Sequence, residues 1–193
     1  SVFLIKKNDS TLSEKLHTSI STYQTARDEF YIQGGKEFLS QRQNLRASFA
    51  QGYNWFLEKE SPSQAIKTFT DSIPSLNNPN MNIKWEARSK EWIKKIANNK
   101  LVGKGKITIE EFTVKRDDFY KKWTPFILSS ASSDFHTTKA SLREALLLII
   151  KPYLVNVDIN DVKSVKKALE PITRQINDAE INHRIIHEWS WKA

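Results

Sequence analysis

The sequence has no cysteine, one methionine, five glycines and six prolines among its 193 residues. The lack of cysteine excludes a disulfide scaffold, a thiolate metal site and a cysteine nucleophile. So few glycines and prolines exclude collagen-like and low-complexity chains. The longest uninterrupted apolar run, Ala145 to Ile150, has six residues, whereas a membrane helix needs roughly 20. We therefore expect a cytoplasmic protein without a membrane segment.

Signatures of enzymes are also missing. The sequence has no HExxH, GxSxG or Walker A motif, and Gly103–Lys106 lacks the Ser or Thr that completes a phosphate loop. The paired carboxylates Glu110-Glu111 and Asp117-Asp118 suit the charge pattern of a helix better than an acid–base pair. We expect no catalytic residue and no cofactor in this chain.

Two residue types invite a ligand but have simpler explanations. His183 and His187 are spaced to share a helix face, as in zinc-binding helices, but the third ligand would have to be Glu188 or a distant residue, and Arg184 between them disfavours a cation. We therefore predict no metal site. Trp85 and Trp92 have the spacing of a helix core, so we expect them to pack rather than to stack on bases.

Positive charge is abundant and unevenly spread. The chain has 30 Lys and Arg against 22 Asp and Glu, a formal charge of +8. Between residues 88 and 106 there are seven basic residues and one acid, Glu91. Such a segment favours an anionic partner, nucleic acid first. The alternative is a solvated helix face that runs into a loop.

Apolar residues recur at helical spacing throughout, and no run of alternating polar and apolar residues competes. We predict an all-α fold. Gly34-Gly35 ends a first helix that starts near Ser10, and Gly52 suggests a close packing contact within the next one, Lys36 to Lys59. Ser61-Pro62, Thr108 with Glu111, and Asp178 are helix starts.

The loop-like stretch Pro74 to Asn82 suggests the main boundary in the chain. We predict two helical units, with a helical domain at 1–82, a basic helix and linker at 83–106, and a second domain at 107–193. Within the second domain we expect a loop at Ser129–His136, a helix capped by Thr137 or Thr138, and a helix from Asp158 to Pro171. Residues 100–106 are predicted to form a flexible connector.

Four segments of the second domain have a recognisable order and spacing. They are Ile107-Thr108-Ile109-Glu110-Glu111-Phe112 running to Trp123; Thr138 with Leu142, Leu146 and Ile149-Ile150; Val157-Asp158-Ile159-Asn160-Asp161-Val162; and Asp178 to Ala193, which contains Asn182-His183-Arg184. In this order they resemble the core-binding domain of tyrosine recombinases, the phage-integrase superfamily. Glu180 departs from the small hydroxyl residue usual in that family.

The resemblance implies a four- to five-helix SAM-like bundle that grips duplex DNA for site-specific recombination or integration. It also implies that the catalytic Arg…His-x-x-Arg…Tyr set lies on a separate domain, so that this chain alone binds DNA without cutting it.

The candidate DNA contacts lie at two expected helix starts and in the basic segment. Helix N-termini bind phosphate, Asn and Arg can read adenine and guanine edges, and lysines neutralise the backbone. These candidates are Thr137, Thr138, Lys139, Arg143, Asn182, His183, Arg184, Lys94, Lys95, Lys100, Lys104 and Lys106. For Thr138 the simpler role is helix capping, and for Asn182 and Arg184 it is exposed helix surface.

Other classes of function fit the same sequence. The main alternative to DNA binding is a helical protein–protein interaction module, an adaptor or effector, in which the charge serves solubility. A helical enzyme with an unrecognised site is the third.

Overall fold

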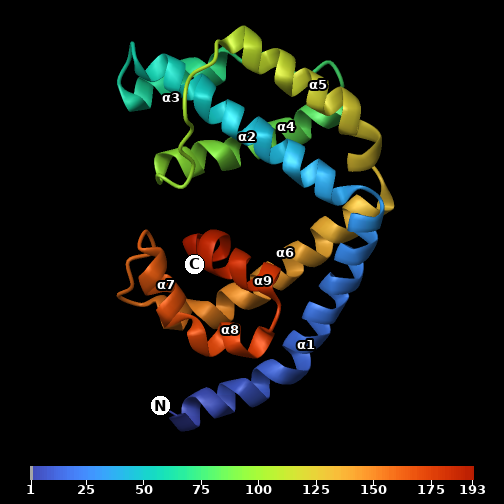
Figure 1. The fold of residues 1–193 in the computed structure, drawn as a ribbon, viewed down its shortest axis with the longest axis vertical. Coiled ribbons are helices and arrows are strands. Elements are labelled where there is room, and N and C mark those ends of the chain that lie inside the picture. Colours follow the sequence, from blue (N-terminus) through green and yellow to red (C-terminus); the bar gives the residue numbers. More distant parts are fainter. Residues whose placement is uncertain (1) are drawn as a thin grey trace. The chain divides into compact units, whose positions relative to one another are not determined.

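The computed structural model describes the backbone of residues 2–193 and the side chains from Glu14 onward. Every regular element in this part of the chain is a helix, so the fold is all-α, as predicted (Figure 1). The elements are α1 (Val2–Ile32), α2 (Gly35–Leu57), α3 (Pro62–Ser72), α4 (Pro79–Ala97), α5 (Ile109–Ile127), α6 (Ser130–Ile150), η1 (Lys151–Leu154), α7 (Val162–Ala168), α8 (Glu170–Ile176), α9 (Ala179–Arg184), η2 (Ile185–Trp189) and η3 (Ser190–Lys192). No helix found within residues 2–193 combines the length and the apolar character that a membrane crossing requires.

The helices form two compact units. Unit 1 combines the residues up to 32 with residues 130–193, and unit 2 is the continuous stretch 33–129. This grouping differs from the predicted domains, because the expected boundary at Pro74–Asn82 lies inside unit 2. The cause is α5, whose buried Arg116 donates a hydrogen bond to the carbonyl of Pro74 and lies over the ring of Trp85. The segment 107–129 therefore packs with residues that precede it in the chain.

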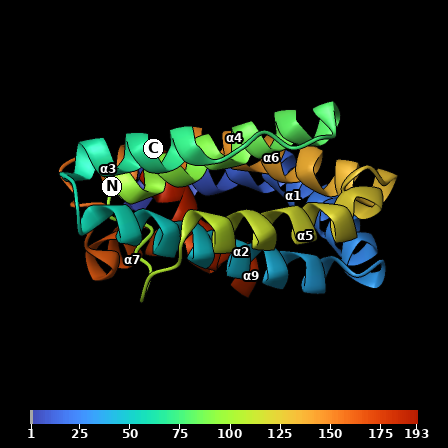
Figure 2. The ribbon, with the colours of Figure 1, turned by 90° about the horizontal axis from the view of Figure 1, so that it is seen from above.

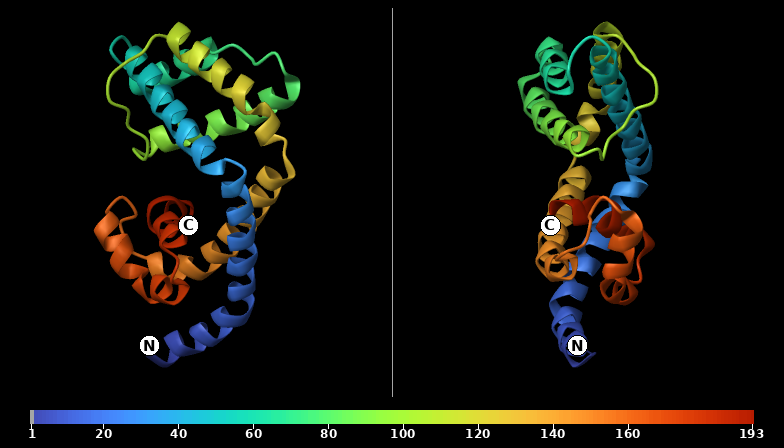
Figure 3. Two further views of the ribbon diagram at one scale, coloured as in Figure 1. Left: turned by 45° about the vertical axis from the view of Figure 1, so that its right-hand side comes forward. Right: turned by 90° about the vertical axis from the view of Figure 1, so that its left-hand side faces the viewer.

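Unit 1 is built on the pair α1 and α6, which lie side by side and run antiparallel (Figures 1 and 3). The rings of Phe30 and Phe135 stack between them with centroids 4.0 Å apart. The short C-terminal helices then pack against α6. Their core consists of fully or almost fully buried side chains, among them Leu142, Leu146, Val165, Leu169, Ile181, Ile185 and Trp189.

Unit 2 is organised around α2, which contacts α3, α4 and α5 (Figure 2). Phe49 of α2 is fully buried, and four aromatic rings have their centroids between 4.9 and 6.1 Å from its own. Gly52, one turn later, confirms the predicted close contact: a Cβ atom there would lie 2.6 Å from Cε1 of Phe69. Only a residue without a side chain lets α3 approach this closely.

Several predicted helix ends are confirmed. Gly34 has φ of 104°, the left-handed conformation that glycine adopts without strain, and it separates α1 from α2. Thr108 and Glu111 form the predicted reciprocal capping box at α5. Asp178 caps α9 by accepting a hydrogen bond from the backbone N–H of Ile181 at 3.0 Å.

Other predicted boundaries are wrong. The expected loop at Ser129–His136 is the first part of α6, because Ala131 and Phe135 are buried on the side facing α1. The next helix starts at Val162 rather than at Asp158, whose carboxylate instead accepts from the N–H of Asn160 in a turn. Pro171 does not end that helix; it lies in the first turn of α8. Proline is common just after a helix because it cannot continue one, and it is also tolerated in a first turn, where the missing N–H would have no partner within the helix.

Candidate nucleic-acid interface

The basic helix α4 buries its aromatic side and exposes lysines on the other. Asn78 caps the helix by accepting hydrogen bonds from the N–H groups of Asn80 and Met81. Trp85 and Trp92 are 5% and 2% exposed, which confirms that they pack in the core. Lys90 and Lys94, one turn apart, are exposed. Both ammonium groups therefore project from one face of the helix.

Two of the acids near this helix, Glu91 and Glu58, are ion-paired, and Glu86 accepts a hydrogen bond from the side-chain amide of Asn82 at 3.0 Å. Glu91 accepts from Arg88 at 3.0 Å and also lies 3.6 Å from the ammonium group of Lys95. Lys106 forms an ion pair with Glu58, the residue that follows α2. In contrast, Lys90, Lys94 and Lys104 have no carboxylate within 4.0 Å among the described residues.

The connector after α4 is held in place, which corrects the prediction that it is flexible. The side-chain amide of Asn54 donates to the carbonyls of Gly103 and Gly105, at 2.8 and 3.1 Å. Gln51 likewise donates to the carbonyl of Lys104 at 2.8 Å. Gly103 lies so close to α2 that a Cβ atom there would be 2.7 Å from that of Ala50. The lysines of the connector are thus carried on a fixed backbone.

We call residues 88–106, the end of α4 and the connector, the basic segment. Unit 2, which contains it, has 17 Lys and Arg against 10 Asp and Glu, a formal charge of +7. Unit 1 is close to neutral, with 13 basic and 12 acidic residues. Nearly all of the excess positive charge of the chain therefore belongs to unit 2.

The structure separates the predicted DNA contacts into the two units. Lys94, Lys95, Lys100, Lys104 and Lys106 lie in the basic segment of unit 2. Thr137, Thr138, Lys139, Arg143, Asn182, His183 and Arg184 lie in α6 and α9 of unit 1.

The contacts predicted on α6 do not lie at a helix start. Thr138 is in the third turn of the helix, and its hydroxyl donates back to the carbonyl of Asp134 at 2.9 Å. Its own N–H is an interior one, so the phosphate site expected at this helix start is absent from α6 at Thr137 and Thr138. Lys139 extends over the ring of Phe135, with its ammonium group 5.6 Å from the ring centroid.

Arg184 is not the exposed residue that base reading requires. Its side chain is 12% exposed and forms ion pairs with Glu180 at 3.4 Å and Glu188 at 3.1 Å. Glu180 also accepts hydrogen bonds from the hydroxyls of Tyr23 and Tyr31 on α1. Because its charge is already matched inside unit 1, Arg184 supports the fold.

A second ion pair completes this polar cluster between α1 and α9. The two terminal guanidinium nitrogens of Arg27 lie 3.2 and 3.1 Å from the carboxylate oxygens of Asp178. Although burial opposes ionisation, hydrogen bonds from Arg27, Gln24 and the backbone of Ile181 lower the pKa of Asp178 from 3.8 to about 2. Burial raises the pKa of Tyr23 to about 12. Around neutral pH, Asp178 is therefore ionised and Tyr23 is neutral, and neither changes its charge.

The remaining predicted residues of α9 are held differently. The amide nitrogen of Asn182 donates to the carbonyl of Thr173 at 3.0 Å. The rings of His183 and His187 have their centroids 4.3 Å apart, but among the residues whose side chains the structure describes, no three potential metal ligands form a group.

Sequence reasoning missed two features of these surfaces. Lys90 was not among the candidate contacts, although its spacing from Lys94 places both on one face. The roles of Gln51 and Asn54 had no local signal, because their bonds join residues about 50 positions apart.

Comparison of the chain with models of protein families, with curated proteins and with solved structures finds no match. The resemblance to tyrosine recombinases stays a prediction.

Proposed function

We propose that the chain binds duplex DNA through unit 2, along the basic segment, by contacts with the phosphate backbone. The observation that carries the proposal is that Lys90, Lys94 and Lys104 are exposed and have no carboxylate within 4.0 Å among the described residues, while Glu91 and Glu58 are bonded to Arg88, Lys95 and Lys106. A DNA phosphate would supply the missing negative charge.

The chemistry of these side chains favours the backbone over the bases. An ammonium group acts as a point charge with rotatable donors, whereas base edges are recognised bidentately by planar groups such as guanidinium and amide. Phosphate contacts release condensed counterions, so this affinity falls steeply with salt. We therefore expect binding that depends little on DNA sequence.

The test is fluorescence anisotropy of a labelled DNA duplex titrated with the full chain at about 50 and 200 mM salt. We expect tighter binding at the lower salt. Each phosphate contact contributes about 0.9 to the slope of log affinity against log salt. Changing Lys90→Gln and Lys94→Gln together is therefore expected to lower that slope by about 2.

The double variant Lys115→Gln/Lys121→Gln is the matched control. It removes the same charge from exposed positions on α5 of the same unit. We expect it to weaken binding less than the α4 variant. Equal losses from both variants would contradict the assignment to the basic segment, and no binding of wild-type chain at low salt would contradict DNA binding itself.

A further inference from the structure

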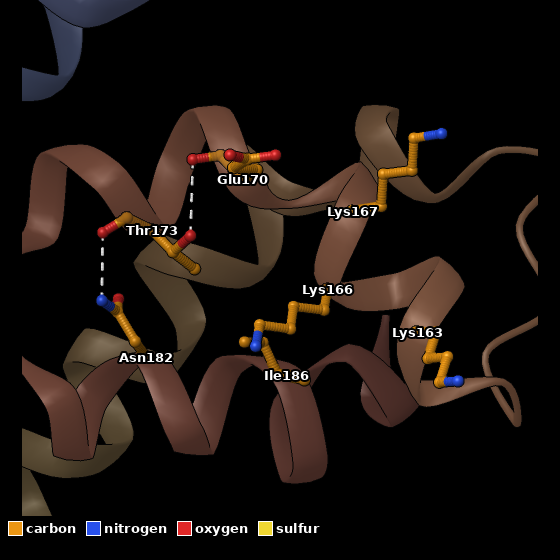
Figure 4. A pocket seen from close by; sticks show the side chains of 7 residues that line it. All are labelled: Lys163, Lys166, Lys167, Glu170, Thr173, Asn182 and Ile186. Atoms are coloured by element: carbon orange, nitrogen blue, oxygen red, sulfur yellow. Dashed lines mark hydrogen bonds between the residues drawn. The ribbon is translucent and has the colours of Figure 1, made fainter.

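Unit 1 has a cavity of about 460 Å³ that the proposed DNA contacts do not use. It lies between α7, α8 and the turn that follows α9 (Figure 4). The residues that line it are Lys163, Lys166, Lys167, Glu170, Thr173, Asn182 and Ile186. Its volume falls within the range of pockets that hold small molecules, about 300 to 1,000 Å³.

Three unpaired lysines line one wall of this cavity. Lys163, Lys166 and Lys167 are spaced so that one face of α7 presents all three, while Val165 is turned into the core. All three are exposed, and none has a carboxylate within 4.0 Å in the described structure. The acid of the lining, Glu170, is bonded to Arg174 at 2.8 Å. The wall is therefore positively charged without an internal counter-charge.

The opposite wall offers a hydrogen-bond acceptor. Asn182 donates its amide N–H to the carbonyl of Thr173, which fixes the side chain and leaves the oxygen Oδ1 as the remaining group. Oδ1 is shielded from solvent and accepts no hydrogen bond from any described residue. An unsatisfied buried acceptor is costly, and a donor on a ligand removes that cost.

The backbone next to the cavity also has an unusual conformation. Ile186 lies in η2, a single π turn that follows α9 directly. Such turns are rare and occur frequently at functional sites. In Figure 4 the side chain of Lys166 extends across the cavity toward Ile186, while Lys163 and Lys167 lie at its edge. Since a lysine stem is flexible, the Lys166 ammonium group can turn toward a ligand in the cavity.

We infer that this cavity binds a small phosphorylated molecule that also carries a hydroxyl or amino group. The lysines of α7 hold its phosphate, since ammonium groups bind phosphate as point charges. Asn182 accepts a hydrogen bond from its donor group, and Ile186 contacts its carbon skeleton. The cavity belongs to unit 1 and the basic segment to unit 2, so this test does not depend on DNA binding.

Calorimetric titration of the full chain with ribose 5-phosphate, inorganic phosphate and ribose tests the inference. Ribose 5-phosphate offers both the charge and the donor, so we expect it to bind most tightly and ribose most weakly. A charge-assisted hydrogen bond is equivalent to about tenfold in affinity. Lys166→Gln together with Lys167→Gln is thus expected to weaken ribose 5-phosphate by tenfold or more.

Two variants make the test specific. Asn182→Ala is expected to weaken ribose 5-phosphate and leave inorganic phosphate unchanged, because only the sugar uses Oδ1. Lys15→Gln with Lys151→Gln removes two exposed charges of unit 1 outside the cavity, and we expect it to leave both affinities nearly unchanged. Circular dichroism checks that every variant is folded.

Three results would overturn the inference. One is ribose 5-phosphate binding no more tightly than ribose. Another is that the control variant Lys15→Gln/Lys151→Gln weakens ribose 5-phosphate binding as much as Lys166→Gln/Lys167→Gln does. The third is the α7 variant weakening duplex DNA more than ribose 5-phosphate, which would assign these lysines to a polymer backbone.

Discussion

Whether a basic side chain can bind a ligand depends on the carboxylates that the fold brings to it, and Arg184 and Lys94 illustrate the two extremes. Both are basic residues of a predicted helix, and both are candidate DNA contacts. Arg184 is bonded to two glutamates and is 12% exposed, whereas Lys94 is exposed and has no carboxylate partner in the described chain. Charge counted along a sequence does not separate these cases.

Replacing Arg184 tests its structural role. Arg184→Gln removes the ion pairs to Glu188 and Glu180, of which Glu180 keeps Arg27 at 3.5 Å, so we expect a loss of about 1 to 2 kcal/mol in the free energy of unfolding. Urea denaturation measures this loss. His183→Gln, at the exposed neighbouring position, is the control and is expected to change stability little. A normal stability together with lost DNA binding would return Arg184 to the list of DNA contacts.

Asp178 gives the protein a dependence on acid. Its pKa is about 2 in the folded chain and 3.8 without the fold, so its contribution is complete above pH 4 and is lost as the pH falls toward 2. With allowance for solvent screening, this contribution is about 1 kcal/mol. We therefore expect Asp178→Asn to be less stable than wild type at pH 6 and equally stable near pH 2.

Denaturation at the two pH values measures the difference. Asp158→Asn, at an exposed turn, is the matched control and should show little difference at either pH. A gap between Asp178→Asn and wild type that persists unchanged at pH 2 would mean that the charge of Asp178 is not its source.

For single helices, local chemistry predicts ends that depend on neighbouring residues and fails where packing decides. The capping box of Thr108 and Glu111 needs only residues three apart, and it is present as predicted. The start of α6 depends instead on Phe135, whose partner Phe30 is about 100 positions earlier. From local composition alone, the serine-rich residues 129–136 are therefore predicted to form a loop.

Gly52 provides a test of packing between α2 and α3. Alanine normally stabilises a helix interior by about 1 kcal/mol relative to glycine. Here the new methyl group would lie 2.6 Å from the ring of Phe69, so we expect Gly52→Ala to destabilise the protein by about 1 to 3 kcal/mol. The double variant Gly52→Ala/Phe69→Leu should recover part of the loss relative to Phe69→Leu alone. An increase in stability from Gly52→Ala would contradict the close contact.

The grouping of helices into units is a property of the whole molecule that no local signal reveals. The loop Pro74–Asn82 has the composition of a domain boundary, yet Arg116 bonds back to Pro74 across it. Unit 1 requires contacts between α1 and residues more than 100 positions away. The sequence was enough to predict an all-α fold with two units, but not to predict which helices belong to which unit.

This membership predicts how fragments behave. Residues 33–129 form a continuous unit with its own aromatic core, so we expect that fragment to fold cooperatively by circular dichroism and to retain DNA binding. Residues 130–193 alone lack α1, and we expect them to fold cooperatively only when a peptide of residues 1–32 is added. A fragment 130–193 that is fully folded without the peptide would contradict the division.

The divided unit 1 also has a consequence during synthesis. Helix α1 leaves the ribosome before unit 2 does, and the helix that covers Phe30 emerges about 100 residues later. At about 5 to 20 residues per second, the exposed aromatic side of α1 waits roughly 5 to 20 s for its partner. Unit 2 has the time to fold within that interval, so we expect α1 to pack in unit 1 only after unit 2, which is synthesised later, has folded.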